Sequence, residues 1–156
     1  MYQMKALGVL SIFILLLTTN SCNEAKKVIN LVSDVQLNGS YAIVNIGGEV
    51  VSSDDTKKVF IAFNSTDKSI QGNTGCNSYF GNYMLDQYSM SFSDIGQTEM
   101  ACEEAVMRTE WNLMQALRDT GSFTLVDNIL TLYSITDRSI LLTAKREVKE
   151  GTDNGN

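Results

Sequence analysis

Acid–base and nucleophilic chemistry in this chain is limited by its side chains, because the 156 residues include no histidine. Ser-His-Asp and Cys-His catalysis and most zinc sites are therefore excluded. Carboxylates remain, and Glu99, Glu103, Glu104 and Glu110 lie close together in the sequence. Two carboxyl groups a few ångströms apart in a cleft can hydrolyse a glycosidic bond. These acids fit a solvated helix face and a first helical turn better, so we expect no enzyme.

Acidic residues also limit the ligands that the chain can bind. Asp54 and Asp55 are adjacent and lack the spaced oxygen ligands of a calcium loop, so we expect no metal and no other cofactor. The formal charge is −6, and no dense lysine and arginine stripe is present. Phosphate binding depends on clustered cations, so nucleic acid is not an expected partner.

The N-terminus has the profile of an export signal. Residues 6–17, ALGVLSIFILLL, are uncharged and follow Lys5. This run is shorter than the roughly 20 apolar residues of a membrane-spanning helix. The next five residues, TTNSC, resemble the lipobox of lipoprotein signal peptidase, with threonine and asparagine at two positions where the commonest form has other residues. We predict a signal peptide over residues 1–21 and a lipid on Cys22; the alternative is an ordinary signal peptide with a coincidental cysteine.

Lipidation would fix the location of the protein. Acyl chains on Cys22 would hold it in a membrane of the cell envelope, either periplasmic or surface-facing on the outer membrane. Residues 22–34 then form the lipid anchor and tether, and residues 146–156 form a polar tail that we expect to be disordered. We expect a monomer whose partner is the membrane, with an envelope protein or a small ligand as a further possibility.

The cysteine count agrees with this location. The chain has three cysteines, so lipidation of Cys22 leaves Cys76 and Cys102, which can form one disulfide in an oxidising compartment. The alternative is a redox or nucleophilic thiol. No Cys-x-x-Cys spacing and no histidine are present to activate a thiolate, so we favour the disulfide.

Short β-branched and aromatic runs alternate with clusters of Gly, Asn, Asp and Ser, which predicts an antiparallel sheet. Turns are expected at Gly47-Gly48, Ser65 to Asp67, Asp86-Gln87, Asp127-Asn128 and Thr136-Asp137, and the fourth of these is typical of a two-residue hairpin. The expected strands are 39–46, 59–64, 69–72, 79–85, 89–94, 123–126, 129–133 and 140–144.

One stretch, residues 102–118, lacks glycine and is rich in helix formers. Val106, Leu113, Met114 and Leu117 form an apolar stripe at helical spacing, with Trp111 at its margin. We expect this helix to cover an open end or face of the curled sheet.

The core must be made by one face of each strand. Tyr79 and Tyr83 should share one face of their strand and Phe80 and Met84 the other. We predict that Phe80 and Met84 fill the interior, and that an exposed tyrosine pair for stacking on a ligand is the alternative. The complete expected core is Ile43, Phe60, Ile61, Phe63, Phe80, Met84, Phe92, Leu125, Leu130, Leu132 and Leu141.

Three sequence blocks resemble the META domain family, to which HslJ-like heat-shock lipoproteins belong. The first is LNGSY at residues 37–41, with Tyr41 where the family has tryptophan. The second, GNTGCNSYFGNY at residues 72–83, is the most specific. The third is TEMAC at residues 98–102 followed by Glu110-Trp111, with Glu99 in place of a basic residue.

The resemblance implies a mainly β (α+β) fold, an antiparallel sheet curled into a small barrel with one packed helix, over residues 35–145. It also implies an envelope lipoprotein linked to stress tolerance, and it supplies no reaction; the absence of histidine is the reason that we expect this module to be non-catalytic. A small-barrel carrier of a lipophilic or envelope ligand is the alternative, and it would require a hollow interior. The motif residues to which the resemblance assigns structural roles are Gly39, Gly72, Gly75, Asn77, Tyr79, Gly81, Thr98, Met100 and Ala101.

Overall fold

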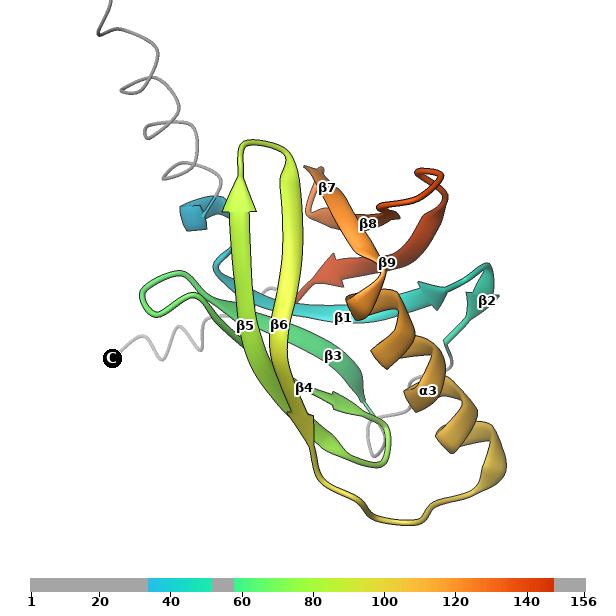
Figure 1. The fold of residues 1–156 in the computed structure, drawn as a ribbon. Coiled ribbons are helices and arrows are strands. Elements are labelled where there is room, and N and C mark those ends of the chain that lie inside the picture. The colour runs from blue at the N-terminus through green and yellow to red at the C-terminus, as the bar shows by residue number, and fades with distance from the viewer. Residues whose placement is uncertain (1–33, 52–57, 148–156) are drawn as a thin grey trace, which may run out of the picture.

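The computed structural model describes residues 34–51 and 58–147, whose strands form one antiparallel sheet that closes on itself (Figure 1). The sheet order is β2-β1-β3-β4-β5-β6-β7-β8-β9, and β1 also pairs with β9. All strands described except β2 therefore form the barrel. The elements are β1 (Gly39–Ile46), β2 (Glu49–Val50), β3 (Val59–Asn64), β4 (Ser69–Thr74), β5 (Ser78–Asp86), β6 (Ser89–Gln97), α3 (Glu104–Arg118), β7 (Thr120–Val126), β8 (Ile129–Ser134) and β9 (Ile140–Arg146).

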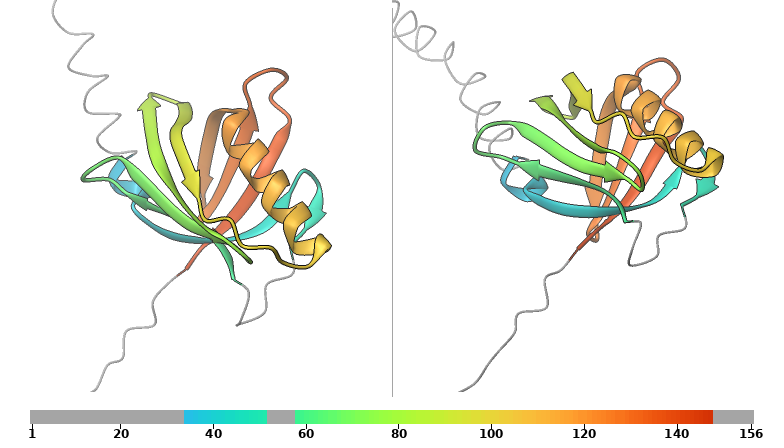
Figure 2. Two further views of the ribbon diagram at one scale, coloured as in Figure 1. Left: turned by 60° about the horizontal axis from the view of Figure 1, so that its bottom comes forward. Right: turned by 90° about the horizontal axis from the view of Figure 1, so that it is seen from below.

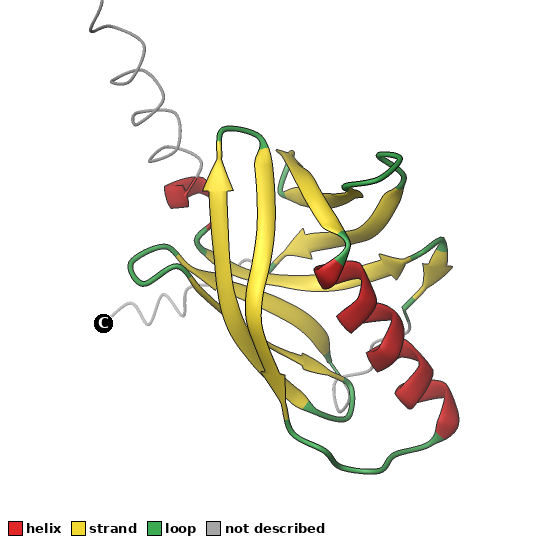
Figure 3. Ribbon diagram, viewed as in Figure 1, coloured by secondary structure: helices red, strands yellow, loops and turns green. Residues whose placement is uncertain are grey.

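This architecture confirms the predicted fold, a mainly β barrel with one packed helix (Figure 3). The expected strands are all present, and several are longer than expected; β6 continues to Gln97 and β7 begins at Thr120. The short strand β2 was not expected. Strand β9 extends to Arg146, a residue that the sequence placed in the tail. The signal peptide, Cys22, most of the tether, Asp54-Asp55 and most of the tail lie outside the described residues.

The turns follow from residues that tolerate positive φ. Asp127 and Asn128 have φ of 50° and 63°, as a type I′ hairpin requires at both central positions. Gly47 and Gly48 have φ of 59° and 92°. These positions match the sequence-based turns, because Asp, Asn and Gly reach the left-handed region at least steric cost.

Two other turns share one local sequence, Thr-Asp-basic-Ser. In the β3–β4 turn Asp67 accepts the backbone N–H of Ser69 at 3.1 Å, and in the β8–β9 turn Asp137 accepts that of Ser139 at 3.0 Å. The basic residues, Lys68 and Arg138, have φ of 59° and 61°. Hydrogen bonds from Ser69 and Ser139 lower the pKa of the two aspartates, so each turn is closed by a charged acceptor.

The barrel interior is filled by alternate strand residues. Tyr41, Ile61, Leu130, Leu132 and Leu142 are fully buried. Three rings pack edge to face in a row: Phe63 lies 5.9 Å from Tyr41 and 5.2 Å from Tyr83, centroid to centroid. Open grooves lie at the surface of the described residues, and one of about 300 Å³ lies between α3 and Val50, Val59 and Gly75. The interior side chains thus supply their own core.

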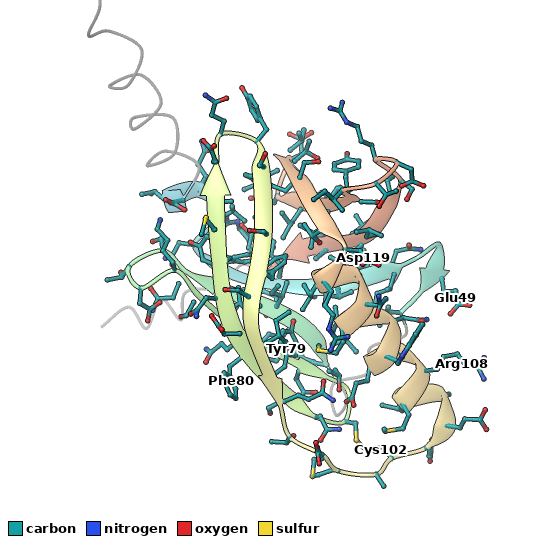
Figure 4. All side chains as sticks on the ribbon, in the orientation of Figure 1. Glu49, Tyr79, Phe80, Cys102, Arg108 and Asp119 are labelled. Atoms are coloured by element: carbon teal, nitrogen blue, oxygen red, sulfur yellow. A yellow bond between two sulfur atoms is a disulfide. The ribbon has the colours of Figure 1, made fainter. Side chains whose placement is uncertain are left out.

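Strand β5 presents the opposite face from the one predicted. Tyr79 and Tyr83 are 1% and 3% exposed, whereas Phe80 and Met84 are 63% and 70% exposed (Figure 4). The period of two was right and the choice of face was wrong. A tyrosine can enter a core when its hydroxyl finds an acceptor, and Tyr79 Oη donates to the Phe60 carbonyl at 3.0 Å. Phe80 lies outside on Gly96, where a Cβ would come within 2.7 Å of the ring.

Helix α3 covers the place where strand pairing is weakest. β6 and β7 share one residue pair, Ser89 with Ser122, whereas β7 and β8 pair along their length. The helix connects these two strands and packs on β1, β4, β6 and β9, so it lies across one end of the barrel (Figure 2). Leu113, Met114 and Leu117 face the core, and Trp111 is 65% exposed. The helix begins at Glu104, two residues later than predicted, because Cys102 is held in the preceding loop.

The inward position of Tyr83 can be tested against its neighbour. We expect Tyr83→Ala to reduce the free energy of unfolding by about 3 to 5 kcal/mol, the cost of deleting a large buried ring. Met84→Ala, in the same strand, should change it by less than about 0.5 kcal/mol because that side chain is exposed. Urea unfolding of both variants measures the difference. A larger loss for Met84→Ala would restore the face predicted from the sequence.

Candidate functional site

The most specific sequence block folds into a tight corner between β4 and β5. The backbone N–H of Thr74 donates to the Asn77 carbonyl at 2.8 Å, which closes the turn. Gly75 has a φ of 91°, a conformation that favours glycine. Its N–H donates to Asn73 Oδ1 at 2.7 Å. The two inner residues, Thr74 and Asn77, are 0% and 1% exposed, so their polar side chains must find partners inside the protein.

The Asn77 side chain uses its complete hydrogen-bonding capacity. Its Oδ1 accepts the Thr98 hydroxyl and the Met100 N–H, each at 2.8 Å. Its Nδ2 donates to the Met100 carbonyl at 3.1 Å and to Glu110 Oε2 at 2.9 Å. One amide therefore joins the corner to the segment before α3 and to α3 itself. This role is broader than the local turn lock that the sequence suggested for asparagine.

Glu110 is the charged centre of this network. Its side chain accepts the Thr74 hydroxyl at 2.7 Å, the Asn77 amide at 2.9 Å and the Gln97 amide at 3.1 Å. The residue is 4% exposed. The prediction that Glu110 lies on a solvated helix face was wrong, because neutral donors from β4, the corner and β6 replace its water. No lysine or arginine among the described residues forms an ion pair with it.

A disulfide joins the same two segments. Cys76 and Cys102 are bonded, with their Cα atoms 6.2 Å apart and a sequence separation of 26 (Figure 4). The predicted pairing is confirmed. Cys76 lies inside the corner beside Asn77, and Cys102 lies directly before α3. The bond and the Asn77 network therefore fix the start of the helix against the barrel from two sides.

The remaining motif glycines give room to neighbouring groups. A Cβ on Gly72 would lie 2.3 Å from the Phe60 carbonyl and 2.4 Å from the Tyr79 ring, so only glycine lets Tyr79 cross β4. A Cβ on Gly81 would lie 3.0 Å from the Ser93 carbonyl, next to the β5–β6 bulge. A Cβ on Gly39 would meet Arg146 at 2.9 Å.

Arg146 holds the first sequence block to the last strand. Its guanidinium donates to the carbonyls of Gln36 and Asn38 and to the Tyr41 hydroxyl, and it lies 4.7 Å from the centroid of the Tyr41 ring. Burial raises the pKa of Tyr41, and the guanidinium opposes that rise. The buried tyrosine thus fills the family's tryptophan position and has a cation as its polar partner.

The other acids do not converge with Glu110. Glu99, Glu103 and Glu104 are exposed, and Glu104 pairs with Arg108 at 3.4 Å. One open groove is lined by two carboxylates, Glu49 and Asp119, which the sequence did not anticipate. Glu49 lies on β2 and Asp119 directly after α3, and Figure 4 labels both. Within residues 34–51 and 58–147, no group of three or more Cys, Asp or Glu side chains is arranged to hold a metal ion.

The third sequence block, residues 98–102, is exposed along its length and contacts the corner through a few polar groups. Thr98 and the Met100 backbone bind Asn77, whereas the Met100 side chain is 57% exposed and Ala101 is also exposed. Glu99 lies in the exposed part of the same segment. The block therefore contacts the corner through the Met100 backbone and the Thr98 hydroxyl.

These features match a known family. The META domain family model matches residues 33–147, close to the expected 35–145. The chain belongs to the META domain family. The match begins just before the helical turn at residues 34–37 and ends just after β9, so it covers the complete barrel, the corner, the disulfide and α3. A search of curated proteins finds no match.

Solved structures share this fold at low sequence identity. An NMR structure from Burkholderia xenovorans has a TM-score of 0.58 and 21% identity, covering 76% of this chain and 89% of that one. A second NMR structure has a TM-score of 0.59 and 22% identity, covering 72% and 93%. A crystal structure of a DUF4847 family protein from Bacteroides vulgatus has a TM-score of 0.52 and 15% identity, covering 74% and 99%. At these identities the likeness concerns the fold.

The burial of Glu110 had a signal in the sequence. Val106, Glu110, Leu113, Met114 and Leu117 follow one helical spacing, so the carboxylate lies within the apolar stripe of α3. A charged side chain within such a stripe is expected to be buried and to have hydrogen-bonding partners inside the protein. Its donors, Thr74 and Gln97, are far away in sequence and could not be named.

Asn77→Ala tests the corner. It leaves the Met100 backbone, Thr98 and Glu110 each short of a partner, so we expect a loss of about 2 to 4 kcal/mol in unfolding free energy. Asn82→Ala, on the exposed face of β5, should cost less than about 0.5 kcal/mol. Chemical denaturation measures both losses. Equal losses of unfolding free energy for Asn77→Ala and Asn82→Ala would show that the Asn77 network does not stabilise the fold.

Removing the disulfide tests the second attachment. The Cys76→Ser, Cys102→Ser double variant should lose about 3.5 kcal/mol, from the loop-closure entropy of its 26-residue separation. Guanidinium unfolding of both proteins measures the loss. Unchanged stability, with the bond confirmed by mass in the parent protein, would contradict this account.

Proposed function

We propose that this META domain protein is a lipid-anchored, non-catalytic module of the cell envelope that contributes to stress tolerance. The observation that carries the proposal is the Cys76–Cys102 disulfide. Such bonds persist in oxidising compartments outside the cytosol. Since the chain has three cysteines, Cys22 is the one left for lipidation, directly after the apolar run.

The non-catalytic part rests on what the candidate groups do. Two of the three cysteines are in a disulfide and cannot act as nucleophiles. Glu110 has its oxygens engaged by three donors, and the acids near it in sequence are exposed. The sequence has no histidine, so the side chain that most often acts as a general base is absent. The stress role follows from the resemblance to HslJ-like lipoproteins.

A carrier of a lipophilic ligand is the alternative from the sequence. Such a carrier needs an interior with space beyond its own side chains. The row of Tyr41, Phe63 and Tyr83 rings and the buried leucines occupy the interior of this barrel. This packing favours the module over the carrier.

Among the described residues, no helix has the length and apolar character needed to cross a membrane.

The lipid on Cys22 is directly testable. Protein purified from membranes should have the mass of the chain beginning at Cys22 plus two or three acyl chains, and it should incorporate labelled palmitate. Cys22→Ser should leave an unprocessed precursor without label. Thr19→Ala, a neighbouring small-residue change, is the matched control and should be processed. A soluble mature form with another N-terminus would refute the anchor.

A further inference from the structure

A groove of about 230 Å³ runs between α3 and the end of β6. It lies on the outer side of the corner network, away from the barrel interior. Its walls are mostly apolar, and Glu110 is the acidic residue among those that line it. The lining residues are Gln97, Met107, Glu110, Trp111, Met114 and Arg118.

The carboxylate of Glu110 retains acceptor capacity on this side. Oε2 accepts two hydrogen bonds, from Thr74 and Asn77, whereas Oε1 accepts one, from Gln97. A carboxylate oxygen can accept about two hydrogen bonds. Gln97 is an exposed residue, so the Oε1 position borders the groove rather than the core.

The charge of Glu110 is balanced only by neutral donors among the described residues. No lysine or arginine nitrogen described lies within ion-pair distance of it. Arg118 lines the same groove two helical turns further on, about 12 Å along the axis at the usual rise per residue. A buried carboxylate without a cation gains more from a cationic ligand than an exposed one does.

The rim of the groove suits an alkyl chain that ends in a cation. Trp111 is 65% exposed and Met107 is 36% exposed, so both apolar side chains can contact a ligand in the groove. An indole face attracts ammonium groups, and thioethers pack against flexible methylene chains.

We propose that this groove binds a lysine side chain of a partner protein. The four methylene groups would lie along Trp111, Met107 and Met114, and the ammonium would donate to Glu110 Oε1. The position of Arg118 limits the ligand to one cation and favours an acidic neighbour beside the lysine. The net charge of −6 assists the approach of a basic partner.

Trp111 makes the proposal measurable because it is the single tryptophan of the chain. The full-length protein in mild detergent is titrated with the peptide acetyl-Ala-Lys-Ala-amide, while Trp111 fluorescence and the indole N–H chemical shift are followed. A saturable change is expected. The matched norleucine peptide, which keeps the alkyl chain and lacks the ammonium, should bind at least about tenfold more weakly, as loss of one charged hydrogen bond implies.

Three variants test whether lysine binding depends on the groove or on the general negative charge of the protein. Glu110→Gln should weaken lysine binding about tenfold, and Glu104→Gln, an exposed acid on the same helix, should leave it unchanged. Gln97→Ala removes the competing donor at Oε1 and should bind at least as tightly as the parent, which keeps the test valid if Glu110→Gln does not fold. The proposal is overturned if Trp111 does not respond, if the norleucine peptide binds equally, if Glu104→Gln weakens binding as much as Glu110→Gln, or if Gln97→Ala loses binding.

Discussion

The fold depends on how the barrel is closed where strand pairing ends. β6 and β7 share one residue pair, so backbone hydrogen bonds alone do not complete the cylinder there. Helix α3 takes their place, and the Glu110 carboxylate, buried beneath it, fixes its position through donors from β4, the β4–β5 corner and β6. A buried charge held by three hydrogen-bond donors is costly to displace, because movement of the helix would leave it without these partners. The Cys76–Cys102 bond limits the same movement covalently.

This constraint explains why the most specific sequence block contains polar and small residues rather than core apolar ones. Asn77 links three segments with one side chain, and Gly72 allows the Tyr79 ring to cross β4 and reach the Phe60 carbonyl. Each residue type answers a geometric need of the corner. The residues of this block therefore attach the helix to the barrel. The groove that contains Trp111 lies on the outer side of that attachment. A ligand bound there would contact the Glu110 carboxylate, the same charged group that holds α3 on the barrel.

Much of this architecture could be predicted from the sequence, and the exceptions have physical causes. The strands and the Asp127-Asn128 hairpin follow from local patterns, namely period two and residues that tolerate positive φ. The disulfide follows from the two cysteines that remain once Cys22 is predicted to carry the lipid. The face of β5 did not follow, because tyrosine and phenylalanine both suit a core and only the Phe60 carbonyl and Gly96, distant in sequence, decide between them. Glu110 was misplaced for the same reason, since its donors come from β4, the β4–β5 corner and β6. The one-pair seam between β6 and β7 leaves no trace in either strand's own sequence.

The central claim is that the polar corner, rather than strand pairing, holds α3 on the open end of the barrel. Native-state hydrogen exchange, residue by residue, compares the parent protein with Asn77→Ala most directly. The claim predicts that amides of α3 and the adjacent end of β6 lose protection together, while those of β1, β8 and β9 keep theirs relative to global unfolding. Loss of protection spread evenly over every strand, or protection of α3 equal to that in the parent, would contradict it.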